Sequence, residues 1–132
     1  MNDIILDKFT GKKVIEINEM YPILVFEEDG FLTIECSWRL RNSKNILVGC
    51  SEYSFEKTHK ETHKKLLKFL IGKAIKNIKF IPPVSDLIIG FENGLYLELF
   101  SNSNIYESWT LSDGKGFDLI SATAGQCCFF NK

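Results

Sequence analysis

The chain has 132 residues, of which 45% are hydrophobic and 25% are charged, and its formal net charge is -1. These values are typical of one folded globular unit, so they exclude intrinsic disorder and low-complexity repeats. The near-neutral charge gives no general attraction to nucleic acid or to an anionic membrane.

The N-terminal segment lacks the features of a targeting sequence. Met1–Asp7 contains no basic residue and only a three-residue apolar run, which is too short for a signal-peptide core. The best candidate for a membrane span, Leu66–Ile71, is interrupted by Lys68 and is far shorter than the roughly 18 residues that a span needs. We therefore expect a cytoplasmic protein with no transmembrane segment and with reduced cysteines.

Strand patterns dominate the first 53 residues. Runs rich in β-branched and aromatic residues predict strands at Val14–Ile17, Ile23–Phe26, Leu32–Arg39 and Ile46–Cys50. Glu28-Asp29-Gly30 predicts a turn that supplies the positive φ of a tight hairpin, and Arg41–Asn45 predicts a second turn. The strict alternation along residues 32–39 predicts a strand with one buried face that includes Trp38.

The pattern changes to a helical period between Lys57 and Ile71. One face carries His59, His63, Leu66, Leu67 and Leu70, and the opposite face carries Lys57, Lys60, Lys64 and Lys68. Gly72 directly follows and is a candidate C-terminal cap. The spacing predicts one amphipathic helix, the only helix expected.

Strand patterns return after the helix. The expected strands are Ala74–Phe80, Leu87–Phe91, Leu95–Phe100, Ile105–Leu111 and Phe117–Ala122. Asn93-Gly94 is the strongest signal for a short hairpin in the chain, and Pro82-Pro83 marks a stiff loop that cannot lie in a central strand.

The two strand-rich parts resemble each other. The matching segments are Phe9–Ile17 with Leu70–Ile78, Ile23–Gly30 with Leu87–Gly94, and Leu32–Glu35 with Leu95–Glu98. A duplicated unit that ends in a tryptophan-bearing strand accounts for this, and its two copies could pack face to face or form one sheet covered by the helix. Chance similarity between short hairpins is the alternative.

We therefore predict an α+β fold, mostly antiparallel β, with two related halves and one central amphipathic helix. Residues 1–132 are expected to form a single domain. Its first β-rich half spans about 9–53, its helix about 57–71 and its second β-rich half about 72–130.

The order of these motifs resembles a family of small bacterial proteins of unknown function. The motifs are Gly11-Lys12, Phe26–Gly30, Trp38-Arg39-Leu40, the helix, Gly72-Lys73, Phe91–Gly94 and Tyr106–Trp109. Such proteins look like those encoded near polymorphic toxin and contact-inhibition loci, where many immunity proteins have this size. The resemblance covers nearly the whole chain and brings no catalytic residues with it.

His59 and His63 are the main candidates for metal chemistry. Two histidines four residues apart on a helix face the same way and can chelate one ion, as in the zinc-protease motif H-E-x-x-H. Here Glu61 lies one position too late and rotates to the opposite face, so it cannot act as the base. No third ligand is placed by the sequence, which favours histidines that rest at the edge of the core.

Lysines are concentrated around the helix. Residues 52–79 contain eight lysines and three glutamates, whereas the whole chain has two arginines, Arg39 and Arg41. A face of lysines alone favours a solvated surface over a nucleic-acid site, and it could also receive an acidic protein partner.

The cysteines predict no zinc site, because Cys36, Cys50, Cys127 and Cys128 lack the paired spacing that such a site needs. We expect Cys36 to be a buried apolar filler. Cys127 and Cys128 would point to opposite faces of a strand, which would expose one of them to oxidation.

Glu107 interrupts an apolar stripe in the expected strand Ile105–Leu111. A buried carboxylate needs a partner, and we hypothesise that Arg39 grips it. The alternatives are that Glu107 lies in water at a strand end, or that the strand register is shifted by one residue.

The sequence favours a non-enzymatic intracellular protein-binding module, with an immunity protein that neutralises a toxin as its most specific form. The candidate contacts are Trp38, Arg39, Tyr106 and Trp109, because Trp, Tyr and Arg dominate interface hot spots. Both tryptophans could instead belong to the core. No cofactor, metal or catalytic residue is assigned, no membrane or nucleic-acid partner is expected, and the oligomeric state stays open. The alternative is a metal- or thiol-dependent enzyme that uses His59 and His63.

Overall fold

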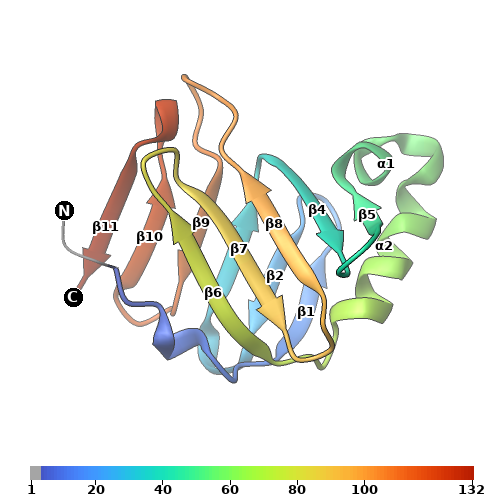
Figure 1. Cartoon of the computed structure of the whole chain (residues 1–132), viewed down its shortest axis with the longest axis horizontal. Coiled ribbons are helices and arrows are strands. Elements are labelled where there is room, and N and C mark those ends of the chain that lie inside the picture. The colour runs from blue at the N-terminus through green and yellow to red at the C-terminus, as the bar shows by residue number, and fades with distance from the viewer. Residues whose placement is uncertain (1–3) are drawn as a thin grey trace.

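A computed structural model describes residues 4–132 and has an α+β fold with two antiparallel sheets, as predicted (Figure 1). In sheet order, the six-stranded sheet contains β1 (Val14–Asn18), β2 (Ile23–Phe26), β3 (Phe31–Ile34), β9 (Trp109–Ser112), β10 (Phe117–Ser121) and β11 (Cys127–Asn131). The five-stranded sheet contains β5 (Ile46–Gly49), β4 (Ser37–Arg41), β8 (Tyr96–Phe100), β7 (Asp86–Phe91) and β6 (Ile75–Ile81). The helices are α1 (Cys50–Ser54) and α2 (Glu56–Leu70), and short 3-10 turns occur at Asp7–Phe9, Glu27–Asp29 and Thr123–Gly125.

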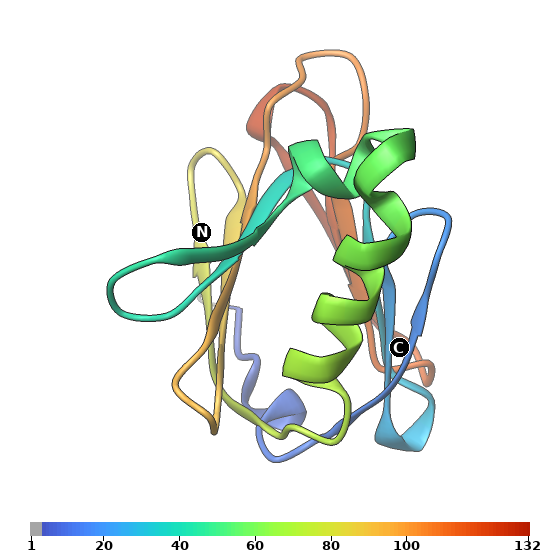
Figure 2. The same ribbon diagram turned by 90° about the vertical axis from the view of Figure 1, so that its right-hand side faces the viewer.

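The two sheets face each other across one hydrophobic core, and α2 lies along the side between them (Figure 2). Leu66 and Leu70 of α2 are buried in this core, as the apolar stripe of the helix predicts, while the lysines of the opposite face are exposed. Gly72 follows the helix with a φ of 80°, so it takes the left-handed conformation of the predicted cap. No described helix is long and apolar enough to cross a membrane.

The topology repeats between the two halves of the chain. The first half supplies three consecutive strands, β1 to β3, to one sheet, and then β4 and β5 to the other. The second half supplies β6, β7 and β8 to the sheet that holds β4 and β5, and then β9 and β10 to the sheet that holds β3. The three-strand units of the two halves therefore lie in facing sheets, as in the predicted face-to-face arrangement. In addition, the β4–β5 hairpin of the first half and the β9–β10 hairpin of the second half each join the sheet of the other half.

Reciprocal hydrogen bonds join the starts of the two halves. The Gly11 amide donates to the Ile75 carbonyl at 2.7 Å, and the Gly72 amide donates to the Val14 carbonyl at 2.8 Å. Gly11 and Gly72 have φ values of 90° and 80°. Gly72 follows Gly11 by 61 residues, and Ile75 follows Val14 by the same 61 residues, which is the offset that the sequence indicates.

The alignment of the hairpins needs a correction of one residue. Phe26 pairs with the start of β1 as Phe91 pairs with the start of β6, so the hairpins match at an offset of 65 rather than 64. The turn explains the difference, because Asp29 with φ 72° takes the place of Gly94 with φ 79°, whereas Gly30 has φ -72°. Glycine at 30 is therefore not the residue that supplies the positive φ.

The same offset continues into the next strands. Leu32 corresponds to Leu97, not to Leu95, because Leu32 pairs with Leu111 of β9 and Leu97 pairs with Leu40 of β4, the equivalent strand of the other half. The two tryptophans then occupy equivalent positions in the two halves, because Trp109 pairs with Ile34 and Trp38 pairs with Leu99.

Three predicted elements differ from the structure. The run 32–39 is two strands in different sheets, which separate at Glu35 and Cys36. The strand expected to end at Cys50 ends at Gly49, and Cys50 begins α1, a short second helix where the sequence predicts only one helix. Residues 105–108 form a loop, and the strand begins only at Trp109.

Candidate functional site

A cleft of about 710 Å³ lies at the end of the sandwich where the β8–β9 loop and α1 are found, uppermost in Figure 1. The lining residues come from the β1–β2 loop, the β3–β4 connection, α1, the first turn of α2 and the β8–β9 loop. They are Met20, Tyr21, Pro22, Ile34, Glu35, Cys36, Ser37, Trp38, Cys50, Tyr53, Ser54, His59, Asn102, Tyr106 and Glu107.

The floor and the rim of this cleft differ in exposure. Trp38 and Tyr53 form the floor, are 4% and 2% exposed, and meet edge to face at 5.4 Å. Met20, Tyr21 and Tyr106 form the rim and are 85%, 63% and 72% exposed. Exposed large apolar side chains grouped around a hollow are typical of a binding surface rather than of an ordinary monomer surface.

The β8–β9 loop is held in place beside the cleft. The Ser103 Oγ accepts hydrogen bonds from the Ile105 and Tyr106 amides at 3.1 and 3.0 Å, and Asn102 Nδ2 donates to Ser37 Oγ at 2.9 Å. These side-chain bonds compete with strand formation, which explains why the predicted strand does not begin at residue 105.

The charge in the cleft is acidic. Glu35 and Glu107 line it, and Glu19 lies beside it with Oε1 3.9 Å from His59 Nε2. Among the lining residues, all of which are described, there is no lysine or arginine. The site therefore presents carboxylates and aromatic rings together, a combination that attracts a cationic group.

Cys36, one of the two cysteines that line the cleft, is a poor nucleophile. Burial raises the pKa of the Cys36 thiol to about 12, with smaller contributions from the neighbouring Cys50 and carboxylates. Because the thiolate is the reactive form, Cys36 stays protonated and unreactive at neutral pH. Cys36 packs against the core but is only half-buried, so it is not the fully buried filler that the sequence predicts.

Both histidines of α2 are engaged through Nδ1. The His59 Nδ1 lies 2.5 Å from the Tyr53 carbonyl oxygen, so it carries the proton and donates. The Tyr53 hydroxyl donates to the Glu19 carbonyl at 3.1 Å, which leaves His63 Nδ1 to donate to the hydroxyl oxygen at 2.8 Å. These are histidines satisfied at the edge of the core, as the sequence favours.

The structure does not build a metal centre from these two rings. They stack at 6.1 Å with an angle of 19° between their planes. Within residues 4–132, no three His, Cys, Asp or Glu side chains are arranged to hold a metal ion.

The predicted contact residues separate into two groups. Trp38 and Trp109 are 4% and 1% exposed, so they belong to the core, the alternative that the sequence left open. Tyr106 is exposed on the cleft rim, and Arg39 lies on the outer face of the five-stranded sheet. The structure brings Tyr106 together with residues that the sequence did not single out, such as Tyr21.

The hypothesised pairing of Arg39 with Glu107 is wrong. Glu107 is exposed in the loop before β9, which is the strand-end alternative. Arg39 instead contacts Glu98, which lies opposite it on β8. The sequence did contain a sign that Glu98 needs a partner, because this carboxylate lies between Leu97 and Leu99 in a predicted strand.

We expect the stability of the protein to fall as the pH drops from about 7.5 to 5.5. Burial lowers the pKa of His63, and His59 adds to this effect, while Glu19 opposes it. A lowered pKa in the folded state means that the unfolded chain binds more protons. The stabilisation from neutral His63 is therefore complete above the ordinary histidine pKa and is lost as the pH falls toward the pKa of His63 in the folded protein. Its slope is at most about 1.4 kcal/mol per pH unit.

Urea unfolding at several pH values measures this dependence. Replacing His63 with Gln should flatten the curve in this window, and a curve equally steep in His63→Gln would assign the dependence to other groups.

Comparisons with protein-family models, with curated proteins and with solved structures found no match to this chain.

Proposed function

We propose that the chain is a non-enzymatic protein-binding module of the cytoplasm, an immunity protein that neutralises a toxin, and that the cleft receives a basic segment of its partner. One observation carries this proposal: the rim of exposed Met20, Tyr21 and Tyr106 surrounds a hollow that holds carboxylates and no cationic side chain. Aromatic anchors around a cleft supply contact area, and complementary charge raises the association rate.

The chemistry of the lining supports binding over catalysis. The thiol of Cys36 has a raised pKa, and the Nδ1 atoms of His59 and His63 are committed to Tyr53. A basic segment would gain cation–π contacts with the rim tyrosines and charge contacts with Glu35 and Glu107.

Co-expression with the product of the neighbouring gene tests the proposal. We expect the two proteins to purify together in a stoichiometric complex, and the affinity to fall with added salt because the contacts are ionic. Protection of growing cells from that product would establish neutralisation.

Substitutions in the cleft locate the interface. The double variant Tyr106→Ala and Glu107→Lys should weaken binding at least about tenfold, or about 1.4 kcal/mol. The matched control is Phe130→Ala with Glu28→Lys, which removes an exposed aromatic ring and reverses an exposed charge away from the cleft. Equal affinities of the two double variants would exclude the cleft as the contact surface.

A further inference from the structure

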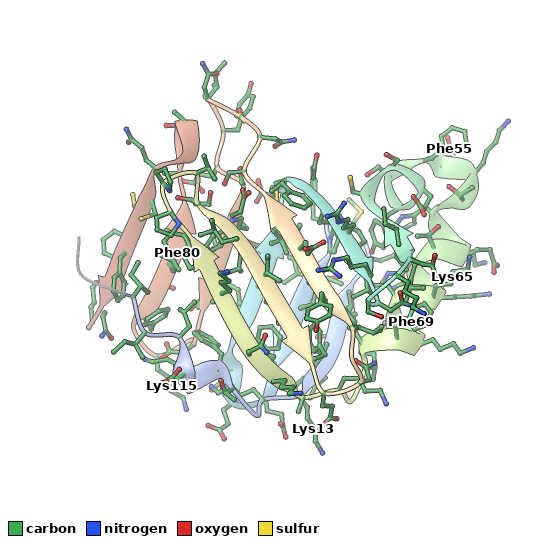
Figure 3. The ribbon with its side chains drawn as sticks, viewed as in Figure 1. Lys13, Phe55, Lys65, Phe69, Phe80 and Lys115 are labelled. Atoms are coloured by element: carbon green, nitrogen blue, oxygen red, sulfur yellow. The ribbon has the colours of Figure 1, made fainter. Side chains whose placement is uncertain are left out.

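A buried carboxylate lies on the face of the five-stranded sheet that points away from the core. Leu97 and Leu99 point into the core, so Glu98 between them points outward, yet it is only 5% exposed. No other element of the described chain lies over this face, which is turned toward the viewer in Figures 1 and 3. The cover comes instead from two neighbouring side chains.

These side chains are the only two arginines of the sequence, Arg39 and Arg41. Their Nε atoms donate to the same Glu98 oxygen, Oε1, at 2.6 and 2.8 Å. Burial acts to raise the pKa of Glu98, but the hydrogen bonds from Arg41 and Arg39 outweigh it and lower the pKa, so the carboxylate is ionised at neutral pH.

Aromatic rings hold the guanidinium groups from the other side. The Arg39 guanidinium lies 5.2 Å from the Phe100 ring centre, and that of Arg41 lies 4.7 Å from the Tyr96 ring centre. Each group is thus fixed by a carboxylate and a ring, a support that limits the entropy lost when it binds a ligand.

Three of the four terminal guanidinium nitrogens have no hydrogen-bond partner among residues 4–132. Both arginines bond Glu98 through Nε, and Arg41 Nη1 also donates to the Asn42 carbonyl at 3.1 Å. Within residues 4–132, the Nη atoms of Arg39 have no hydrogen-bond partner, and the two side chains are 40% and 32% exposed. The cluster has one more positive than negative charge, and Lys79 lies in the same row of the sheet.

The other half of the molecule shows that the fold does not require this cluster. The residues that correspond to Glu98 and Arg39 are Thr33 and Thr110, which pair across β3 and β9. A neutral pair therefore serves the same position in the six-stranded sheet. Because burying charged groups costs desolvation energy, the fold itself gains little from the charged version.

We propose that Arg39 and Arg41, positioned by Glu98, form a binding site for an oxyanion, either a carboxylate or a phosphate. A pair of oriented guanidinium groups offers several N–H donors in the fork geometry that such anions accept. The site lies on the outer sheet face and does not depend on the cleft or on its proposed partner.

Nuclear magnetic resonance of the arginine Nε–H groups tests this site directly. Because the chain has only two arginines, the two Nε–H signals report on this cluster alone. Inorganic phosphate and glutarate are added separately, each at constant ionic strength maintained with chloride. We expect saturable shifts of both signals with an apparent Kd of about 1 to 10 mM for at least one probe.

The two probes distinguish the sources of the anion. Saturation by glutarate alone assigns a carboxylate site, saturation by phosphate alone assigns a phosphate site, and saturation by both supports a general oxyanion site. Shifts that stay linear for both probes, or that equal those with chloride, overturn the proposal.

Two variants of the cluster and one control variant test the assignment. The double variant Arg39→Thr with Glu98→Thr copies the pair of the other sheet, and the affinity read from the Arg41 signal should fall at least about tenfold. If that variant does not fold, Arg39→Lys keeps the charge without the planar fork and should lose a similar factor. Lys44→Gln removes an exposed lysine from the β4–β5 turn and should leave the affinity unchanged, and an equal loss in Lys44→Gln would point to nonspecific charge attraction.

Discussion

Replacement of Trp109 by Ala is expected to lower the free energy of unfolding by about 3–5 kcal/mol, the range for removal of a buried aromatic side chain. Trp109 is 1% exposed, its ring meets Phe80 edge to face at 6.0 Å, and its Nε1 donates to the Ser85 carbonyl at 2.9 Å. The substitution would leave a cavity between the sheets and remove the donor that joins β9 to the β6–β7 loop. Chemical denaturation measures the change.

One control variant separates the cavity from the hydrogen bond, and a second compares the equivalent tryptophan of the other half. Trp109→Phe keeps most of the apolar surface and loses the N–H, so it should cost only about 1–2 kcal/mol. Trp38→Ala removes the corresponding ring of the other half and should cost about as much as other buried aromatic truncations. A loss below about 1 kcal/mol in Trp109→Ala would contradict its place in the core.

Replacement of Tyr53 by Ala is the second large effect, with an expected loss of about 3–5 kcal/mol. Tyr53 is 2% exposed, and its ring contacts Trp38, His59 and His63. Through this side chain, α1 packs against α2 and against Trp38, the other residue of the cleft floor. The unfolding free energy should therefore fall, and the near-ultraviolet circular dichroism of the Trp38 environment should change.

Tyr53→Phe isolates the hydroxyl group. The ring contacts stay, while His63 loses its acceptor and the Glu19 carbonyl loses its donor. The expected loss is about 1–2 kcal/mol. If the Phe and Ala variants were equally destabilised, the hydrogen bonds rather than the ring packing would hold this corner together.

Local sequence patterns correctly predicted the helices, strands and turns that depend mainly on neighbouring residues. The alternation in Leu95–Phe100 and the Asn93-Gly94 turn correspond to β8 and its hairpin, and the apolar stripe after Lys57 corresponds to α2. The repeated topology was also visible in the sequence, because each half carries its own glycine and hairpin. The alignment of the two hairpins was wrong by one residue, because Asp29 and not Gly30 has the positive φ that corresponds to Gly94.

The sites depended on contacts between distant segments, which local patterns do not contain. Glu98 and Arg39 meet only because β4 pairs with β8, 59 residues further along the chain. The cleft forms from loops of several elements, and its loop at residues 101–108 is fixed by side-chain hydrogen bonds that a strand pattern does not reveal. Ile105 and Tyr106 are apolar and so suggested a strand, but both side chains are exposed in the loop. Phe55, at the outer corner between α1 and α2, is another large apolar side chain that is exposed (Figure 3).

The exchange of hairpins makes each half of the molecule incomplete without the other. A polypeptide cut between α2 and β6 would yield two fragments, neither of which contains a whole sheet. Two separate copies of such a unit could form the same pair of sheets as a symmetric dimer, so covalent linkage here replaces association. Unfolding of either half of the chain would remove strands from both sheets, so we expect the whole chain to unfold at once.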